Sequence, residues 1–148
     1  MATTFDVIVL GGGPAGYVCA IRCAQLGLST AVVERDKLGG VCVNVGCIPS
    51  KALLQSASLA NTIRHDAEQF GINVGEVTLD FGAAIKHSRD VSDQNSKGVG
   101  FLMKKHKVTV IEGTGTLKPG RKIAVGSETY TATKAVVVAI VDDVEVAE

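Results

Sequence analysis

The chain has 148 residues, of which 46% are hydrophobic, 20% are charged and only 4% are aromatic. Its 15 basic and 15 acidic residues give a formal net charge of zero, so neither nucleic acid nor an anionic membrane surface is expected as a partner. No apolar run approaches the roughly 20 residues of a membrane span, and the expected absence of a secretory signal predicts a reducing, cytoplasmic compartment.

A strand, a glycine turn, a helix and a second strand follow one another at the start of the chain. Residues 5–10 form an apolar run typical of a strand buried on both faces of a parallel sheet. Residues 11–16 are rich in glycine and predict a turn, and residues 17–26 predict a helix. Residues 29–33 predict a second strand that ends at Glu34. This order predicts a βαβ unit with parallel strands and a right-handed crossover.

Two further helices are expected, over residues 51–67 and 80–107. The second contains Gly98 and Gly100, where we expect a break, and Asp80 or Thr78 would be its N-cap.

The pattern changes to short strands after the second of these helices. An antiparallel meander is predicted from the runs at 108–111, 114–117, 122–125 and 129–131. The apolar run at 135–139 predicts a return to the parallel sheet, and the acidic tail at 141–148 is expected to be solvated. The fold class expected is α/β, a Rossmann-like domain with a parallel sheet, crossover helices and a small meander.

The glycine turn has the spacing Gly-x-Gly-x-x-Gly at Gly11, Gly13 and Gly16, between a strand and a helix. In this context the glycines permit a tight turn, close approach of a pyrophosphate and close helix packing. Glu34 ends the next strand, where a carboxylate can accept hydrogen bonds from a ribose 2′-hydroxyl. The interpretation is a dinucleotide site, although such a turn can be purely structural and the motif does not decide between FAD and NAD.

Cys42 and Cys47 lie five residues apart after a glycine-rich turn, where a helix is expected to begin. A helix N-terminus favours a thiolate, so the pair is interpreted as a redox-active dithiol. Since positions five apart on a regular helix diverge, Cys42 should lie in the turn before the helix or in a distorted first turn. Pro49 fits the first helical position. A structural disulfide or half of a zinc site are the alternatives.

The remaining polar and cysteine clusters have plainer interpretations. Cys19 and Cys23 share one helix face but are too far apart for a disulfide, so we expect them to be packing residues. The basic cluster at 104–107 is interpreted as a solvated helix end rather than a docking patch. No Ser/His/Asp order or metal-ligand cluster is seen.

Three stretches resemble the dihydrolipoamide dehydrogenase family, a branch of the pyridine nucleotide–disulfide oxidoreductases: GGGPAGYVCAIRCAQLG, AVVERDKLGGVCVNVGCIPSKALL and, more weakly, FLMKKHKVTVIEGTGTL. The likeness covers residues 5–139. Glutathione and mercuric reductases are similar at the cysteine motif. The resemblance implies that FAD is bound by Gly11, Gly13, Pro14, Ala15, Gly16, Glu34, Arg35, Gly39, Gly40, Val41, Cys42, Lys51 and Gly115.

The resemblance also implies roles for individual side chains. Cys42 would exchange with the lipoyl group, and Cys47 would lie beside the flavin and pass electrons to it. Lys51, one helical turn after Cys47, would stabilise the reduced flavin, although an ordinary solvated lysine is the alternative. Gly115 would allow the backbone to approach the adenine end.

The resemblance further implies a homodimer that passes electrons to NAD and serves a lipoyl-bearing protein of a 2-oxo acid dehydrogenase or glycine cleavage system. Residues 1–148 would be the N-terminal part of the FAD-binding domain, without the family's NAD domain and its interface domain. The interface domain carries a His–Glu pair, a role that we assign to none of His65, His87 and His106. The alternatives are a truncated, non-catalytic module that binds FAD or a partner, and a glutathione or mercuric reductase relative.

Two departures from the family pattern concern the cofactor. Val41 replaces the usual threonine, so a hydroxyl contact is lost. Ile140-Val141 replace the usual Thr-Gly after the strand at 135–139, which puts a second FAD contact in question.

Overall fold

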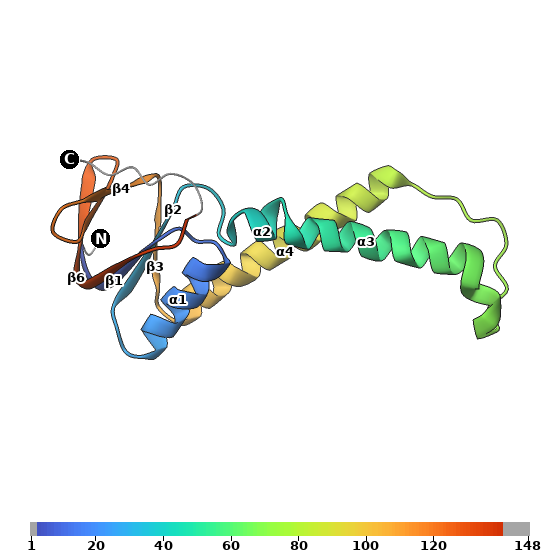
Figure 1. The fold of residues 1–148 in the computed structure, drawn as a ribbon, viewed down its shortest axis with the longest axis horizontal. Coiled ribbons are helices and arrows are strands. Elements are labelled where there is room, and N and C mark those ends of the chain that lie inside the picture. Colours follow the sequence, from blue (N-terminus) through green and yellow to red (C-terminus); the bar gives the residue numbers. More distant parts are fainter. Residues whose placement is uncertain (1–2, 141–148) are drawn as a thin grey trace.

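The computed structural model describes residues 3–140, which form a sheet-based body and a long helical arm (Figure 1). The sheet has six strands in the order β3-β2-β1-β6-β5-β4. Neighbours from β3 to β6 pair in parallel, whereas β5 and β4 run antiparallel. The strands are β1 (Thr4–Leu10), β2 (Thr30–Glu34), β3 (Thr109–Glu112), β4 (Gly115–Lys118), β5 (Lys122–Val125) and β6 (Glu128–Val138). The predicted α/β, Rossmann-like class is confirmed.

The helices are α1 (Pro14–Gln25), α2 (Gly40–Asn44), α3 (Cys47–Asn61) and α4 (Phe81–Lys105), with a π-helical turn η1 (Thr62–Asp66) and a 3₁₀ turn η2 (Ala67–Phe70). Helices α3 and α4 pack against each other and together form the arm, which projects away from the sheet (Figure 1). None of the helices within residues 3–140 has the length and apolar character that crossing a membrane requires.

Strand β1 is the centre of the core, because both of its faces are buried as the sequence predicted. Ile8 and Leu10 point to one side of the sheet, where they pack with side chains of β2, β5 and β6. Val7 and Val9 point to the other side, where they pack with α1 and with Met103 of α4. This alternation follows from the two-residue period of a strand. The body end of α4 is therefore anchored in the core.

Helix α1 begins at Pro14, three residues before the predicted start. Gly13 is the N-cap and Pro14 occupies the first helical position. Proline is well suited to that position because its missing N–H would have no intrahelical partner there. The glycine motif thus leads directly into the helix.

Helix α4 is continuous, and the expected break at Gly98 and Gly100 is wrong. Asp80 is the N-cap, because its Oδ1 accepts a hydrogen bond from the N–H of Ala83 at 3.0 Å. The helix remains regular since one stripe of it is buried along its length, at Ser88, Ser92, Val99 and Met103. Packing of this stripe outweighs the cost of about 1 kcal/mol that each glycine imposes.

The predicted meander is also corrected. Strand β3 pairs in parallel with β2 and belongs to the main sheet, so the antiparallel part consists of β4, β5 and the first half of β6. The two runs expected at 129–131 and 135–139 form the single strand β6, which pairs with β5 and then with β1. The acidic tail at 141–148 lies outside the described residues.

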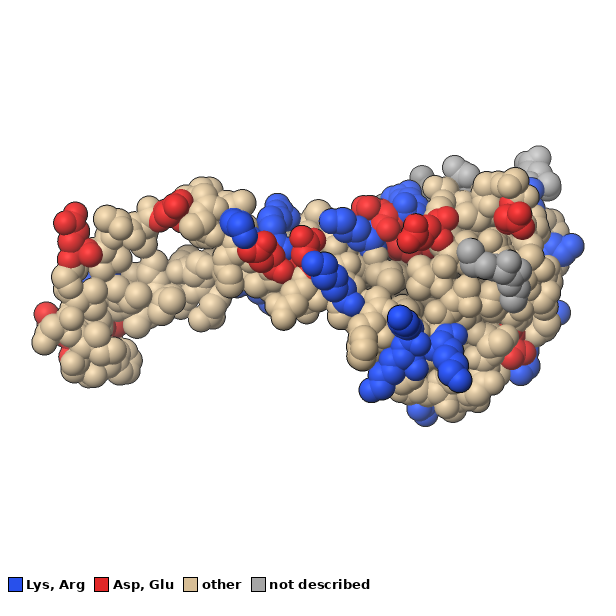
Figure 2. Space-filling view, turned by 180° about the vertical axis from the view of Figure 1, so that it is seen from behind, with Lys and Arg blue, Asp and Glu red and all other residues tan. Residues whose placement is uncertain are grey.

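Figure 2 shows Lys and Arg side chains intermingled with Asp and Glu side chains on the part of the arm next to the sheet-based body. Lys86 and Asp90 form an ion pair at 2.6 Å on the surface of α4. Lys37 and Asp93 form another at 3.6 Å, between the turn after β2 and α4. Exposed pairs of this kind contribute little to stability, so the anchoring of α4 rests on packing.

Candidate functional site

The glycine turn at 11–16 lies at the carboxyl end of β1, where ligands bind in open α/β sheets. A Cβ atom on Gly16 would overlap the carbonyl oxygen of Gly11, so the third glycine of the motif is required by close packing inside the turn. A Cβ atom on Gly13 would meet nothing within 4 Å, so the start of α1 faces open space. The turn therefore leaves room for an anionic group at a helix N-terminus.

Glu34 closes the other side of this space from the end of β2. Its Oε2 accepts a hydrogen bond from the N–H of Gly12 at 2.7 Å, and its Oε1 accepts one from the N–H of Asp36 at 2.9 Å. Each carboxylate oxygen has a second lone pair, which leaves capacity to accept bonds from the hydroxyls of a ribose.

A second glycine-rich turn, at Gly39 and Gly40, places the cysteine motif next to the turn at 11–16. The N–H of Gly39 donates to the carbonyl of Gly12 at 2.9 Å, and a Cβ on Gly40 would stand only 2.9 Å from the Cα of Gly13. Gly40 also has a φ of +59°, which glycine adopts without strain. The two turns therefore lie backbone against backbone.

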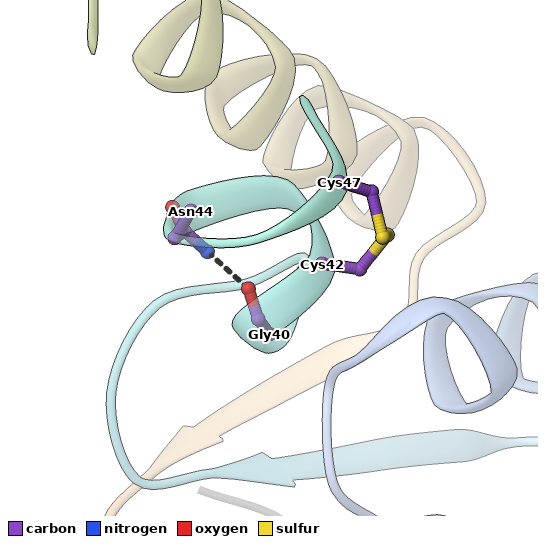
Figure 3. Close-up of a disulfide and its surroundings, with 4 residues drawn as sticks. All are labelled: Gly40, Cys42, Asn44 and Cys47. Atoms are coloured by element: carbon purple, nitrogen blue, oxygen red, sulfur yellow. Dashed lines mark hydrogen bonds between the residues drawn. A yellow bond between two sulfur atoms is a disulfide. The ribbon is translucent and has the colours of Figure 1, made fainter. Parts of the chain in front are cut away.

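Cys42 and Cys47 form a disulfide, with their Cα atoms 4.7 Å apart (Figure 3). Cys42 lies in α2, a five-residue helix of its own, and not in a turn before α3 or in its distorted first turn as expected. Cys47 is the first residue of α3 and Gly46 its N-cap, so Pro49 is the third helical residue rather than the first. Val45 and Gly46 lie between the two helices with non-helical dihedral angles, so the spacing of one regular helix does not apply to the two cysteines.

A cavity of about 550 Å³ lies between these turns, and it is within the range usual for ligand sites. Most of the predicted cofactor residues line it: Gly11, Gly13, Pro14, Ala15, Glu34, Arg35, Gly40, Val41, Cys42 and Gly115. Cys47 lines it too. The structure thus brings the dinucleotide motif and the disulfide to one cavity, and the glycine turn, the carboxylate and the cavity size fit FAD.

Three predicted residues do not line the cavity. Gly16 lies within the packed turn, and Gly39 is buried against the side chain of Val43. Lys51 is exposed on α3, one helical turn after Cys47, and its role toward a flavin stays a prediction. Gly115 does line the cavity, but a Cβ there would also stand 2.6 Å from Cδ1 of Leu10, so core packing also favours a glycine.

The two departures from the family pattern both lie at the cavity. Val41 is 73% exposed, and its carbonyl accepts hydrogen bonds from the N–H groups of Val45 and Gly46. Ile140 lines the cavity beside Gly11, whereas Val141 is outside the described residues.

Sequence reasoning missed Asp36, Lys37, Asn44 and Ala139, which also line the cavity. Asp36 and Lys37 follow the carboxyl end of β2, and Ala139 follows that of β6. Their positions after parallel strands were a usable signal, because such strands end at one edge of the sheet. Asn44 carries no comparable signal.

Cys19 and Cys23 are free and half-buried on α1, where they pack against the core as expected. Burial, and secondly the adjacent Cys23 thiol, raises the pKa of the Cys19 thiol. A raised thiol pKa disfavours the nucleophilic thiolate of Cys19. Neither Cys19 nor Cys23 lines the cavity that Cys42 and Cys47 share. Among residues 3–140, no group of three or more His, Cys, Asp or Glu side chains could hold a metal ion.

Comparison with known proteins assigns the family. A family profile described as pyridine nucleotide-disulphide oxidoreductase matches residues 5–140. The chain belongs to this family. Dihydrolipoyl dehydrogenase of Mycobacterium tuberculosis is 53% identical over 140 residues, which cover 91% of this chain and 30% of that protein.

Other relatives agree with this assignment. Dihydrolipoyl dehydrogenase of Corynebacterium glutamicum is 52% identical over 125 residues, 84% of this chain and 26% of the relative. The enzyme of the same name from Bacillus subtilis is 53% identical over 117 residues, 79% of this chain and 24% of the relative. The chain therefore spans less than a third of the length of these relatives. The predicted resemblance is confirmed, and membership of this family of enzymes implies FAD and NAD(H) as cofactors.

Proposed function

We propose that residues 1–148 are the N-terminal part of the FAD-binding domain of a flavoprotein that oxidises dihydrolipoamide to lipoamide. Electrons pass through the Cys42–Cys47 pair and FAD to NAD. One observation supports this most strongly: both cysteines line the same cavity as the Gly11–Gly16 turn and Glu34. The names of the relatives support the choice of dihydrolipoamide as the substrate.

The protein's own residues perform thiol–disulfide exchange in this proposal. A substrate thiolate attacks the sulfur of Cys42, which breaks the Cys42–Cys47 bond and forms a mixed disulfide with Cys42. Cys47 leaves as a thiolate, which is favoured at the N-terminus of the 15-residue helix α3. The second substrate thiol then attacks the substrate sulfur that is bonded to Cys42. The disulfide ring of lipoamide closes, and Cys42 is released as a thiolate. Two electrons and two protons have left the substrate.

FAD, when bound, would supply a two-electron acceptor for the dithiol and a two-electron donor for NAD. The Gly11–Gly16 turn would hold its pyrophosphate at the start of α1, and Glu34 would bind its adenosine ribose. Gly40 to Cys42, which line the cavity, would lie along the cofactor beside the disulfide, and Lys51 would favour the reduced flavin.

The partners and location in this proposal follow the resemblance. The full-length protein would be a homodimer that accepts electrons from a lipoyl-bearing protein of a 2-oxo acid dehydrogenase or glycine cleavage system. A reducing compartment, the cytoplasm, suits a disulfide that works by opening and closing.

Turnover by the full-length protein on three substrates tests the proposal. We expect NAD-linked oxidation of dihydrolipoamide, with little reduction of glutathione disulfide or mercuric ion by reduced nicotinamide. Faster turnover on either of these two would move the protein to the corresponding reductase class. A protein that binds FAD but turns over none of them would support the non-catalytic module.

A further inference from the structure

We propose that Asn44 is a positioning residue for the disulfide: its side-chain amide holds α2 in place so that Cys42 stays within bonding reach of Cys47. The inference rests on the proposed redox role of this cysteine pair. It assigns a function to a residue that lies between the two cysteines and does not itself react.

The amide nitrogen of Asn44 faces three backbone carbonyls. Its Nδ2 lies 2.9 Å from the carbonyl oxygen of Gly40, 3.2 Å from that of Leu38 and 3.5 Å from that of Lys37 (Figure 3 draws the first). The group has two hydrogens, so the two shorter contacts use them. These carbonyls also fix the orientation of the amide, because a flipped Oδ1 would face oxygen atoms.

The other end of the amide adds no bond. Oδ1 of Asn44 is buried and has no hydrogen-bond partner among the described residues. A buried unpaired acceptor costs free energy, of the order of 1–3 kcal/mol. The hydrogen bonds of this side chain with the rest of the described chain are therefore those of its donor group.

The carbonyl of Leu38 joins this amide to the arm. It accepts a second hydrogen bond from Oγ of Ser96 on α4, at 2.8 Å. Nη1 of Arg89, also on α4, lies 3.4 Å from the carbonyl oxygen of Asn44. Helix α4 is itself anchored in the core at Met103. The short helix α2 is thus held from two sides.

This bracing matters most when the disulfide is open. Reduction breaks the S–S bond, and the covalent path between α2 and α3 is then only Val45 and Gly46. The equilibrium between dithiol and disulfide depends on how often the two sulfurs meet, that is, on their effective concentration. With the amide in place the sulfurs remain close, whereas without it the reduced form gains freedom and becomes favoured.

Redox equilibration of the full-length protein with dithiothreitol tests the inference. The reagent's two thiols become a cyclic disulfide as the Cys42–Cys47 bond becomes two thiols, and alkylation followed by mass analysis counts the cysteines that have opened. Asn44→Asp places an anionic oxygen opposite the carbonyls of Leu38 and Gly40. We expect it to shift the equilibrium at least tenfold toward the dithiol, which is a potential about 30 mV less negative.

Two further variants keep the test decisive. Asn95→Asp makes the same chemical change on the exposed face of α4, where Nδ2 donates to the carbonyl of Val91 at 2.8 Å, and should shift the equilibrium less than twofold. Ser96→Ala should shift it in the same direction as Asn44→Asp but less, because Leu38 keeps one donor. If Asn44→Asp does not fold, Asn44→Ala takes its place with the same expected direction.

An Asn44 variant that folds and keeps the wild-type equilibrium overturns the inference, because a purely structural brace stabilises the oxidised and reduced forms equally. A wild-type protein whose disulfide does not exchange with dithiothreitol would contradict the proposed function instead. The two failures are therefore distinguishable.

Discussion

The carboxylate of Glu34 and the backbone N–H of Gly12 are joined by a 2.7 Å hydrogen bond that connects the ends of two parallel strands. The bond links the glycine turn to the residue expected to bind ribose. Because the acceptor is charged, such a bond is worth about 1.5–3 kcal/mol. The position of the glycine turn relative to the end of β2 therefore depends on Glu34 even before a ligand enters.

Replacing Glu34 should weaken FAD binding. Glu34→Ala removes the acceptor for Gly12 and the proposed ribose contact, so we expect at least a tenfold loss of affinity, about 1.4 kcal/mol. Titration with quenching of flavin fluorescence measures this. Glu112→Ala is the matched control, since Glu112 pairs in register with Glu34 on β3 but does not line the cavity. Equal losses in both variants would contradict the assignment.

Two glycine-to-alanine changes should act in opposite directions. Gly16→Ala would drive a Cβ into the carbonyl of Gly11, so we expect a loss of about 1–3 kcal/mol in the free energy of unfolding. Gly98→Ala places a Cβ in open space on α4, so we expect a gain of about 1 kcal/mol from helix propensity. Urea denaturation compares them, and a destabilised Gly98→Ala would show that α4 is not a continuous helix.

Asp6 should make stability depend on pH. Its pKa is lowered first by the hydrogen bond from the N–H of Ser29, at 3.0 Å, and next by Lys134, at 3.3 Å. A carboxyl whose pKa is lower in the folded state stabilises the protein above its unfolded pKa, and this contribution disappears as pH falls through the folded pKa.

The difference in free energy of unfolding between wild type and Asp6→Asn should therefore be largest near neutral pH and shrink below about pH 4. Denaturation curves at several pH values measure it. Asp90→Asn, in the exposed pair with Lys86, serves as the control for removing a surface charge. A difference that stays constant from pH 7 to pH 2 would refute this prediction.

Local patterns were sufficient for the parallel half of the fold. The apolar run of β1 and the Gly11–Gly16 spacing depend on residues close in sequence, and both were predicted correctly. Strand β3 was misassigned to the meander because nothing local distinguishes a short parallel strand from an antiparallel one. The two halves of β6 were read as separate strands since the polar residues Thr133 and Lys134 interrupt the apolar pattern, although the strand continues through them.

Most of the residues predicted for the site line one cavity, but the geometry that brings them there was not predictable from the sequence. The cysteine spacing indicated a dithiol, yet a separate helix for Cys42 could not be inferred, because α2 is held by contacts made by Asn44 and by α4. Ser96 lies 58 positions from the Leu38 carbonyl that it binds. Such long-range contacts leave no periodic trace in the sequence.

Anaerobic two-electron reduction of the full-length protein, followed by absorbance, tests the central claim most directly. We predict a yellow protein whose reduction produces a long-wavelength band from contact between the Cys47 thiolate and the flavin. The band should vanish in Cys47→Ser and persist in Cys19→Ser, where a cysteine outside the cavity is removed. A yellow protein that shows no such band on reduction would contradict the assignment of Cys42 and Cys47 as the redox dithiol.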